Sequence, residues 1–196
     1  ADPTSTGNTS AGSLYALFSP MNKKLNSAGE VNHTRIVHCA GNVEHWLNGV
    51  LVCRANIGSV DWNQRVAASK FAAWSDFGTV KKGHIVLQEH GHDVWFRSIR
   101  IREIPTTERW RFGHFEQLFN GHNMDGWSAY LNSDGKMDDV WSVADGIISC
   151  KGKPAGYIYT NHQYQDFILE VDWRWDPVTK KGGNSGVLFR QVGEHK

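Results

Sequence analysis

The densest group of side chains that could do chemistry lies in the segment Gln88-Glu89-His90-Gly91-His92-Asp93. An imidazole can take up and release a proton near neutral pH. Gln88 and His90 are two residues apart, so they share a face of an extended chain, and Gly91 permits a turn directly after them. The segment predicts either a sugar-hydroxyl or general-base site or a polar hairpin tip. Two histidines without a placed carboxylate do not indicate a metal site, and we expect no bound metal.

A second candidate is the carboxylate pair Glu170 and Asp172. On a strand these residues point the same way, with about 6–7 Å between their Cα atoms, which suits an acid/base or nucleophile pair acting on a sugar. The pattern resembles the Glu-x-Asp-x-Glu motif of β-jelly-roll glucanases. The next position on that face is Arg174, however, so the third acid is missing. The alternative interpretation is a solvated strand face in which the arginine is a counter-ion.

A third candidate is the glycine-rich segment 182–186, which contains Asn184 and precedes Arg190. It lacks the Lys-Ser/Thr ending of a phosphate loop, which argues against nucleotide binding. Arg190 lies on the strand face opposite Val187, where its guanidinium can fork onto sugar hydroxyls or a carboxylate. The alternative is a surface salt bridge. Trp46 is one of nine tryptophans, whose rings stack on sugars, although most of them should belong to the core.

Short strands must position these residues. The Asn-Gly pair at 48–49 and the Asp-Gly pair at 145–146 lie between apolar runs and predict tight hairpins. A third hairpin is predicted to turn at 89–93. Between 166 and 175, apolar and polar residues alternate, which predicts a half-buried strand. Further strands are expected at 13–17, 34–39, 157–160 and 186–190, and one short helix at 62–71.

These many short strands with frequent turns predict an all-β sandwich or jelly roll. Arg97 has the strand parity of Trp95 and Ile99, so we expect it to point toward the interior and to need a partner there. The three cysteines are expected to be buried thiols.

The composition narrows the functional classes. Of the 196 residues, 40% are hydrophobic and 21% are charged, which predicts a folded domain. The formal net charge is +1 and no basic stripe stands out, which argues against a nucleic-acid partner. No apolar run approaches the roughly 20 residues of a membrane helix, and no signal peptide is visible at the start.

Several short motifs together resemble one known family. The second half of the chain contributes Phe119-Asn120-Gly121, Gly126-Trp127, and the runs 141–148, 164–174 and 183–190. The first half contributes the runs 11–15, 44–49, 69–71, 83–91 and 94–99. In number and in order within each half, these motifs resemble the 3-keto-disaccharide hydrolase-like domain, which was long catalogued as a domain of unknown function.

The two halves occur in swapped order relative to that family. Residues 1–104 resemble its C-terminal half, residues 115–196 resemble its N-terminal half, and residues 105–114 form a linker. A middle piece that holds a Glu-x-Gln strand appears in neither half. Three arrangements fit: a circularly permuted domain, a piece of a tandem of two domains, or a homodimer that exchanges strands by domain swapping.

The resemblance implies a concanavalin A-like jelly-roll β-sandwich, without a cofactor, that is secreted or periplasmic and acts on 3-keto glycosides. A ketone at C3 acidifies the C2 hydrogen, so the glycosidic bond can be cleaved by β-elimination and hydration. Such a reaction needs a base and a group that polarises the ketone.

From position and chemistry, and not from the family, we predict His90 or Glu170 as the base, with Arg190 as a further catalytic residue. We predict that the sugar is bound by Gln88, Asp172, Asn184 and Trp46. A non-catalytic carbohydrate-binding module is the first alternative. The second is an interaction domain whose edge strands pair with another chain.

Overall fold

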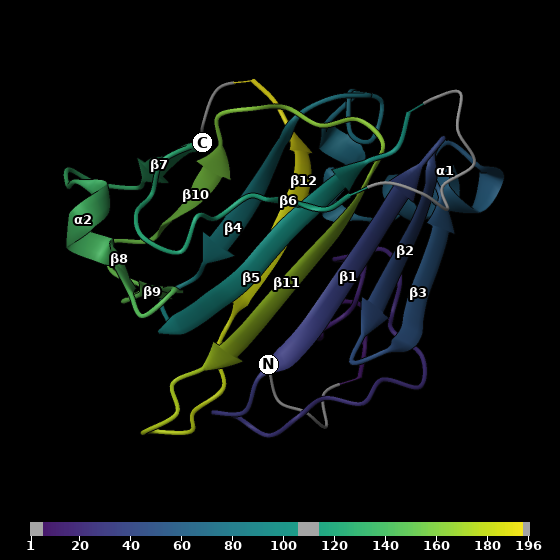
Figure 1. Ribbon diagram of the computed structural model, residues 1–196. Helices are drawn as coiled ribbons and strands as arrows, with labels where there is room; N and C mark the ends of the chain where they lie inside the picture. The colour runs from purple at the N-terminus through teal and green to yellow at the C-terminus, as the bar shows by residue number, and fades with distance from the viewer. Residues whose placement is uncertain (1–5, 106–113, 194–196) are drawn as a thin grey trace.

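Two antiparallel β-sheets packed face to face form the protein (Figure 1). The computed structural model describes residues 6–105 and 114–193. Its strands are β1 (Asn32–Cys39), β2 (Asn42–Leu47), β3 (Val50–Asn56), β4 (His84–Glu89), β5 (Val94–Glu103), β6 (Glu116–Gln117), β7 (Trp127–Leu131), β8 (Trp141–Ala144), β9 (Ile147–Cys150), β10 (Gly156–Thr160), β11 (Phe167–Trp175) and β12 (Ser185–Gln191). The predicted all-β sandwich is confirmed.

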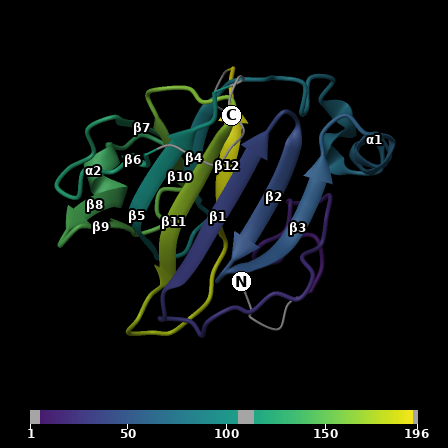
Figure 2. The ribbon, with the colours of Figure 1, turned by 45° about the vertical axis from the view of Figure 1, so that its right-hand side comes forward.

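Each sheet contains strands from both the first and the second half of the chain. The large sheet has the order β3-β2-β1-β11-β5-β9-β8, with β6 paired to β5 (Figure 2). The small sheet has the order β12-β4-β10-β7. In the large sheet β11 lies between β1 and β5, and in the small sheet β4 lies between β12 and β10. The interior is therefore built jointly by the two segments.

Two predicted hairpins are confirmed by their turn geometry. Asn48 and Gly49 have φ angles of 48° and 80°, and Asp145 and Gly146 have φ angles of 51° and 71°. Both central residues of each turn thus adopt the left-handed region that a tight two-residue hairpin needs. The strand predicted at 166–175 is confirmed as β11, in which Phe167, Leu169, Val171 and Trp175 are buried. Burial does not alternate along it, since Ile168 and Glu170 are buried as well.

The third predicted hairpin is wrong, because β4 and β5 belong to different sheets. The turn at 90–93 carries the chain from the small sheet to the large one. A strand predicted at 13–17 is also wrong: this segment forms turns, with an isolated bridge between Leu14 and Phe18.

The single helix predicted at 62–71 is divided into two. The first, α1 (Val60–Ala67), is capped by the Ser59 side chain, and a separate 3-10 turn, η1 (Lys70–Ala73), is capped by the Ser69 side chain. A serine that accepts a backbone N–H begins a new helical segment and so ends the previous one. Together α1 and η1 bury Trp62 and Phe71 against Leu17 and Ala55.

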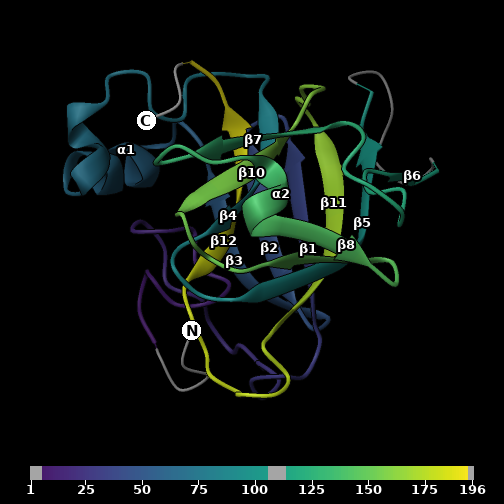
Figure 3. The same cartoon turned by 90° about the vertical axis from the view of Figure 1, so that its left-hand side faces the viewer.

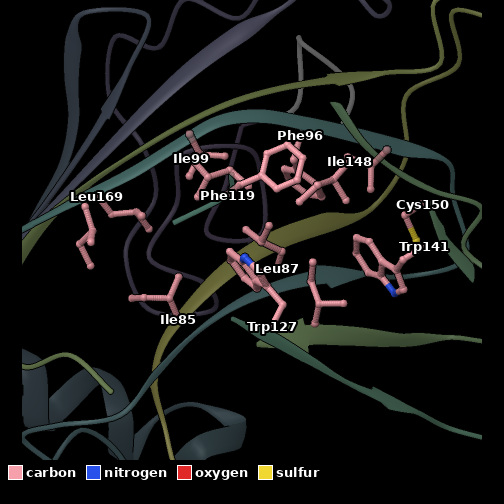
Figure 4. Packing of buried hydrophobic residues seen from close by; sticks show 14 of the residues in the cluster. Ile85, Leu87, Phe96, Ile99, Phe119, Trp127, Trp141, Ile148, Cys150 and Leu169 are labelled. Atoms are coloured by element: carbon pink, nitrogen blue, oxygen red, sulfur yellow. The ribbon is translucent and has the colours of Figure 1, made fainter. Parts of the chain in front are cut away.

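The core lies between the two sheets. Ile85 and Leu87 of the small sheet face Phe96, Ile99 and Leu169 of the large sheet (Figure 4). A short helix, α2 (Met137–Val140), contacts β7 of the small sheet and β8 of the large sheet, so it closes one end of the sandwich (Figure 3). No helix in residues 6–105 or 114–193 is long and apolar enough to cross a membrane.

Two of the three cysteines are buried as predicted. Cys53 and Cys150 are buried, Cys39 is half-buried, and none of the three forms a disulfide. Burial raises the pKa of Cys150 to about 12, so its thiol stays neutral. These side chains fill space and are not poised as nucleophiles.

Candidate functional site

The outer face of the small sheet carries a row of aromatic and polar side chains. Because Leu87 and Ile158 face the core, strand alternation places Gln88 of β4 and Tyr157 of β10 on the outside. The strand registers align Tyr130, Tyr157, Gln88 and Gly186 directly across the sheet. This row runs from β7 to β12, and its two central residues, Tyr157 and Gln88, line a pocket.

The pocket opens where β4 ends and β10 begins, and it has a volume of about 220 Å³. Its lining residues are Gln88, Glu89, His90, Asn132, Ala155, Gly156 and Tyr157. The predicted shared face of Gln88 and His90 therefore leads into a real concavity. The pocket combines an aromatic ring, two amides and an imidazole, which is the mixture of groups that suits a sugar ring.

Glu89 holds the wall of this pocket together. It is 2% exposed, and its carboxylate accepts hydrogen bonds from the backbone N–H of Gly91 at 2.7 Å and of Gly156 at 2.5 Å. One side chain thus ties the end of β4 to the following turn and to the start of β10. The sequence prediction did not name Glu89 as a site residue. The sequence did contain an indication of this role. Glu89 is two residues from Leu87 and four from Ile85, so it points to the same inner face of the strand, where a carboxylate needs hydrogen-bond partners.

The glycine-rich segment lies against the turn that carries His90. Ser185 Oγ donates a hydrogen bond to the Gln88 carbonyl at 2.6 Å. The His92 Nδ1 atom lies 3.2 Å from the His90 carbonyl oxygen and 3.4 Å from the Asn184 amide nitrogen. A Cβ on Gly183 would stand 2.4 Å from the His92 Cβ, so only glycine permits this approach. Asn184 consequently lies beside the turn at 90–93, and it is not among the residues that line the pocket.

Glu170 and Asp172 lie on the opposite side of the sandwich, on the outer face of the large sheet. Glu170 is 1% exposed and accepts hydrogen bonds from Arg35 Nε at 2.8 Å and Arg100 Nε at 2.6 Å. Asp172 Oδ1 lies 2.8 Å from His33 Nδ1, and its Oδ2 lies 3.5 Å from Arg97 Nε. Both carboxylates are engaged in ion pairs, but their partners come from neighbouring strands and do not include Arg174, and Glu170 is buried where the alternative interpretation expected a solvated face.

The surroundings of Glu170 favour its charged form. Burial alone would raise its pKa, but the hydrogen bonds and charges of Arg35 and Arg100 outweigh burial and hold the pKa below its usual value. A base that removes a proton from carbon works best with a pKa nearer the working pH. Glu170 is therefore arranged as the centre of a charge network.

Bulges redirect two of the predicted side chains. The register of β12 shifts between Phe189 and Gln191, and Arg190 adopts a φ of 60°. The Arg190 guanidinium thereby reaches His38, which is 2% exposed, with 3.1 Å between Arg190 Nη1 and His38 Nε2. In β5, Ser98 has a φ of 51°, and the Arg97 side chain is 48% exposed beside Asp172. The expected inward direction of Arg97 is wrong.

The seven predicted site residues thus occupy three places. Gln88, His90 and Asn184 lie together at one end of the small sheet. Glu170 and Asp172 lie on the outer face of the large sheet, and so does Trp46, whose Nε1 donates to Glu44 at 3.0 Å. Arg190 lies against His38. Of the seven residues, Gln88 and His90 line the same pocket.

No group of three or more His, Cys, Asp or Glu side chains in the described part of the chain is arranged to hold a metal ion.

Comparisons with known proteins agree with the motifs found in the sequence. The profile of the 3-keto-alpha-glucoside-1,2-lyase-like domain matches residues 1–102 and 114–196. The chain belongs to this family. One relative, a 3-keto-disaccharide hydrolase of Bacteroides thetaiotaomicron, is 30% identical over 105 residues, which are 48% of this chain and 36% of the relative. The aligned part thus spans about a third of that relative's length, and the family predicted from the motifs is confirmed.

Proposed function

We propose that the protein binds a 3-keto glycoside in the pocket at the end of β4 and cleaves its glycosidic bond. The observation that carries this proposal is the pocket itself, which is lined by His90, Gln88, Asn132 and Tyr157 among others. The name of the family and that of the bacterial relative supply the class of substrate. The imidazole of His90 is the group in this pocket that can accept a proton from carbon.

The proposed reaction begins with removal of the C2 proton by the neutral ring of His90. The electron pair of the C2–H bond moves onto the C3 oxygen as an enolate. When the C3=O bond re-forms, a C1=C2 double bond forms, the C1–O bond breaks, and the protonated ring of His90 gives its proton to the oxygen of the leaving sugar. Addition of water across the double bond, with a proton returning to C2, completes a net hydrolysis. The amides of Gln88 and Asn184 can donate hydrogen bonds to the C3 oxygen, on which negative charge develops.

Substitution of His90 tests this proposal. In the His90→Ala variant we expect kcat/KM for 3-keto-trehalose to fall by a factor of about 100 or more, because general-base catalysis is worth that much. Product release can be followed by chromatography, and C2 proton exchange by NMR in heavy water. His122→Ala removes an exposed histidine from the loop before β7 and should leave the rate unchanged. Equal rates for His90→Ala and wild type would contradict the proposal.

A non-catalytic carbohydrate-binding module is the second candidate. The tyrosines beside the pocket favour it, because aromatic rings bind sugars without any chemistry. It predicts that wild-type protein binds 3-keto-trehalose and leaves it intact. In that case the His90→Ala variant would bind 3-keto-trehalose as wild type does, and it would also leave the sugar intact.

A secreted or periplasmic location and a strand-exchanged homodimer also belong to the proposal. The location is supported by the family resemblance, and fractionation of the source cells tests it. Strand exchange would require a second copy to supply the strands that one chain here supplies to itself in both sheets. Size-exclusion chromatography at several concentrations tests it, and a monomer at every concentration would contradict it.

A further inference from the structure

A buried histidine and an arginine join the two sheets at the edge strand β12. His38 of β1 is 2% exposed, and the rings of Phe167 and Phe189 pack against it, each with a centroid distance of 5.9 Å. The His38 Nε2 atom lies 3.1 Å from Arg190 Nη1. Among the described strands β12 pairs only with β4, and β1 belongs to the other sheet. The contact between His38 and Arg190 is therefore a bridge from the edge of one sheet to the other sheet.

The hydrogen-bond partners of His38 determine where its proton lies. The Nδ1 atom lies 2.9 Å from the carbonyl oxygen of Gln165, which can only accept a hydrogen bond, so Nδ1 carries the hydrogen. In the neutral ring Nε2 then has a lone pair, and it accepts a hydrogen bond from the Arg190 guanidinium. Because a guanidinium can donate hydrogen bonds but cannot accept them, this bond exists only while His38 is neutral.

Two charged side chains of the described residues face the ring of His38. Arg190 faces Nε2, and Asp166 Oδ1 lies 3.4 Å from Nδ1. The neighbouring strand β2 adds His45, whose ring packs edge-on against Phe189. Burial and, next to it, the charge of Arg190 lower the pKa of His38, although Asp166 acts in the opposite direction. The folded protein therefore favours the neutral ring.

The backbone of Arg190 is held in an unusual conformation. Arg190 has a φ of 60° at the point where the register of β12 shifts between Phe189 and Gln191. A Cβ on Gly83 would stand 2.5 Å from the Arg190 carbonyl carbon, so this bulge packs directly on a glycine. A left-handed conformation is unfavourable for an L side chain and persists where neighbouring contacts hold it. Arg190 Nε is buried without a hydrogen-bond partner in the described part of the chain, where the guanidinium depends on His38 for its hydrogen bond.

We propose that His38 and Arg190 form a pH-sensitive latch, which holds the end of β12 against the large sheet at neutral pH and releases it on acidification. Protonation of His38 places a hydrogen on Nε2, which then faces an N–H of Arg190 and no longer accepts from it. Two positive groups 3.1 Å apart in a buried place repel each other, so the arginine side chain must move away. The bulge thereby loses the contact that holds it. This inference does not depend on the proposed function.

Hydrogen exchange followed by mass spectrometry tests the latch in the intact protein. A released imidazole has an ordinary pKa of about 6.5, so opening should become up to about tenfold more frequent between pH 7.5 and pH 5.5. After correction for the intrinsic pH dependence of exchange, the protection of residues 185–193 should fall over this range, while that of β10 stays constant. In His38→Gln the side chain keeps a donor and an acceptor but does not titrate, so the protection of β12 should not change with pH.

His45→Gln is the matched control. His45 is another buried histidine beside β12, and burial lowers its pKa as well. The pH dependence of β12 should persist in His45→Gln. The latch is overturned if wild type shows no pH dependence, if His38→Gln keeps it, or if His45→Gln loses it.

A second measurement keeps the proposal testable if His38→Gln does not fold, as judged by thermal denaturation. In Arg190→Met the pKa of His38, measured by NMR, should be higher than in wild type, because the cation that faces the ring is gone. The protection of residues 185–193 should also be low at both pH values. An unchanged pKa of His38, or protection equal to that of wild type at pH 7.5, would overturn the proposal.

Discussion

Glu89 and Glu170 are both almost completely buried, yet their partners give them different tasks. Glu89 accepts two backbone N–H groups and fixes the wall of the pocket. Glu170 accepts side-chain hydrogen bonds from Arg35 and Arg100, each of which remains partly exposed. Sequence parity could place Glu170 on the outer face of its strand. It could not identify the arginines, because Arg35 and Arg100 come from two other strands that pair with β11 only in the folded sheet.

The charge network predicts a stability effect at the level of this residue. In Glu170→Gln we expect the free energy of unfolding at pH 7 to fall by about 1–3 kcal/mol, since two charge-assisted hydrogen bonds are lost and water partly screens the arginines. Because the folded-state pKa of Glu170 is lowered, its contribution is present above the unfolded-state value of about 4.3 and is lost as the pH falls through the folded-state pKa.

Urea denaturation of wild type and Glu170→Gln from pH 7 to pH 3 measures this difference. The gap between the two proteins should narrow as the pH falls below about 4. A gap that is constant over this range would contradict the ion-pair interpretation. If Glu170→Gln unfolds like wild type but no longer cleaves 3-keto-trehalose, the result would indicate that Glu170 on the large sheet, and not His90, is the catalytic base.

At the scale of elements, hairpins and alternation could be predicted, but bulges and sheet changes could not. Glycine at the second turn position marks the hairpins at 48–49 and 145–146, because it readily adopts a positive φ. Ser98 and Arg190 also have positive φ angles, but nothing in their residue types indicates it. Each bulge shifts the parity of the residues beside it, so the directions predicted for Arg97 and Arg190 failed.

The contact between the glycine-rich segment and the turn at 90–93 gives a prediction at this scale. Gly183→Ala would place a methyl group 2.4 Å from His92 Cβ, so one of the two segments must shift. We expect a loss of about 1–3 kcal/mol in the free energy of unfolding and weaker sugar binding, because His90 moves with its turn. Thermal denaturation and calorimetry measure the two effects.

Gly186→Ala is the matched control in the same segment for the loss of stability. Its added methyl group would meet no atom closer than 3.8 Å, so the free energy of unfolding should stay near that of wild type. Equal destabilisation by the two substitutions would show that the packing of Gly183 on His92 is not what holds the turn.

At the scale of the whole molecule, both sheets depend on strands from both segments. Residues 6–105 supply β1 to β5, and residues 114–193 supply β6 to β12. Without the second segment, β1 and β5 lose β11 from between them, and β4 loses both of its partners. Neither segment alone completes either sheet. The linker predicted at 105–114 lies mostly outside the described residues. The dependence of each segment on the other therefore follows from the strand order of the two sheets.

This interleaving predicts fragment complementation. Residues 1–105 and 114–196, produced separately, should each lack a cooperative thermal transition, because a segment of about 100 residues without its neighbouring strands buries too little apolar surface. When mixed, they should form a 1:1 complex whose near-ultraviolet circular dichroism matches that of the intact chain. Light scattering gives the stoichiometry. If residues 1–105 alone unfold cooperatively as a monomer, that segment folds independently and the interior is not built jointly by the two segments.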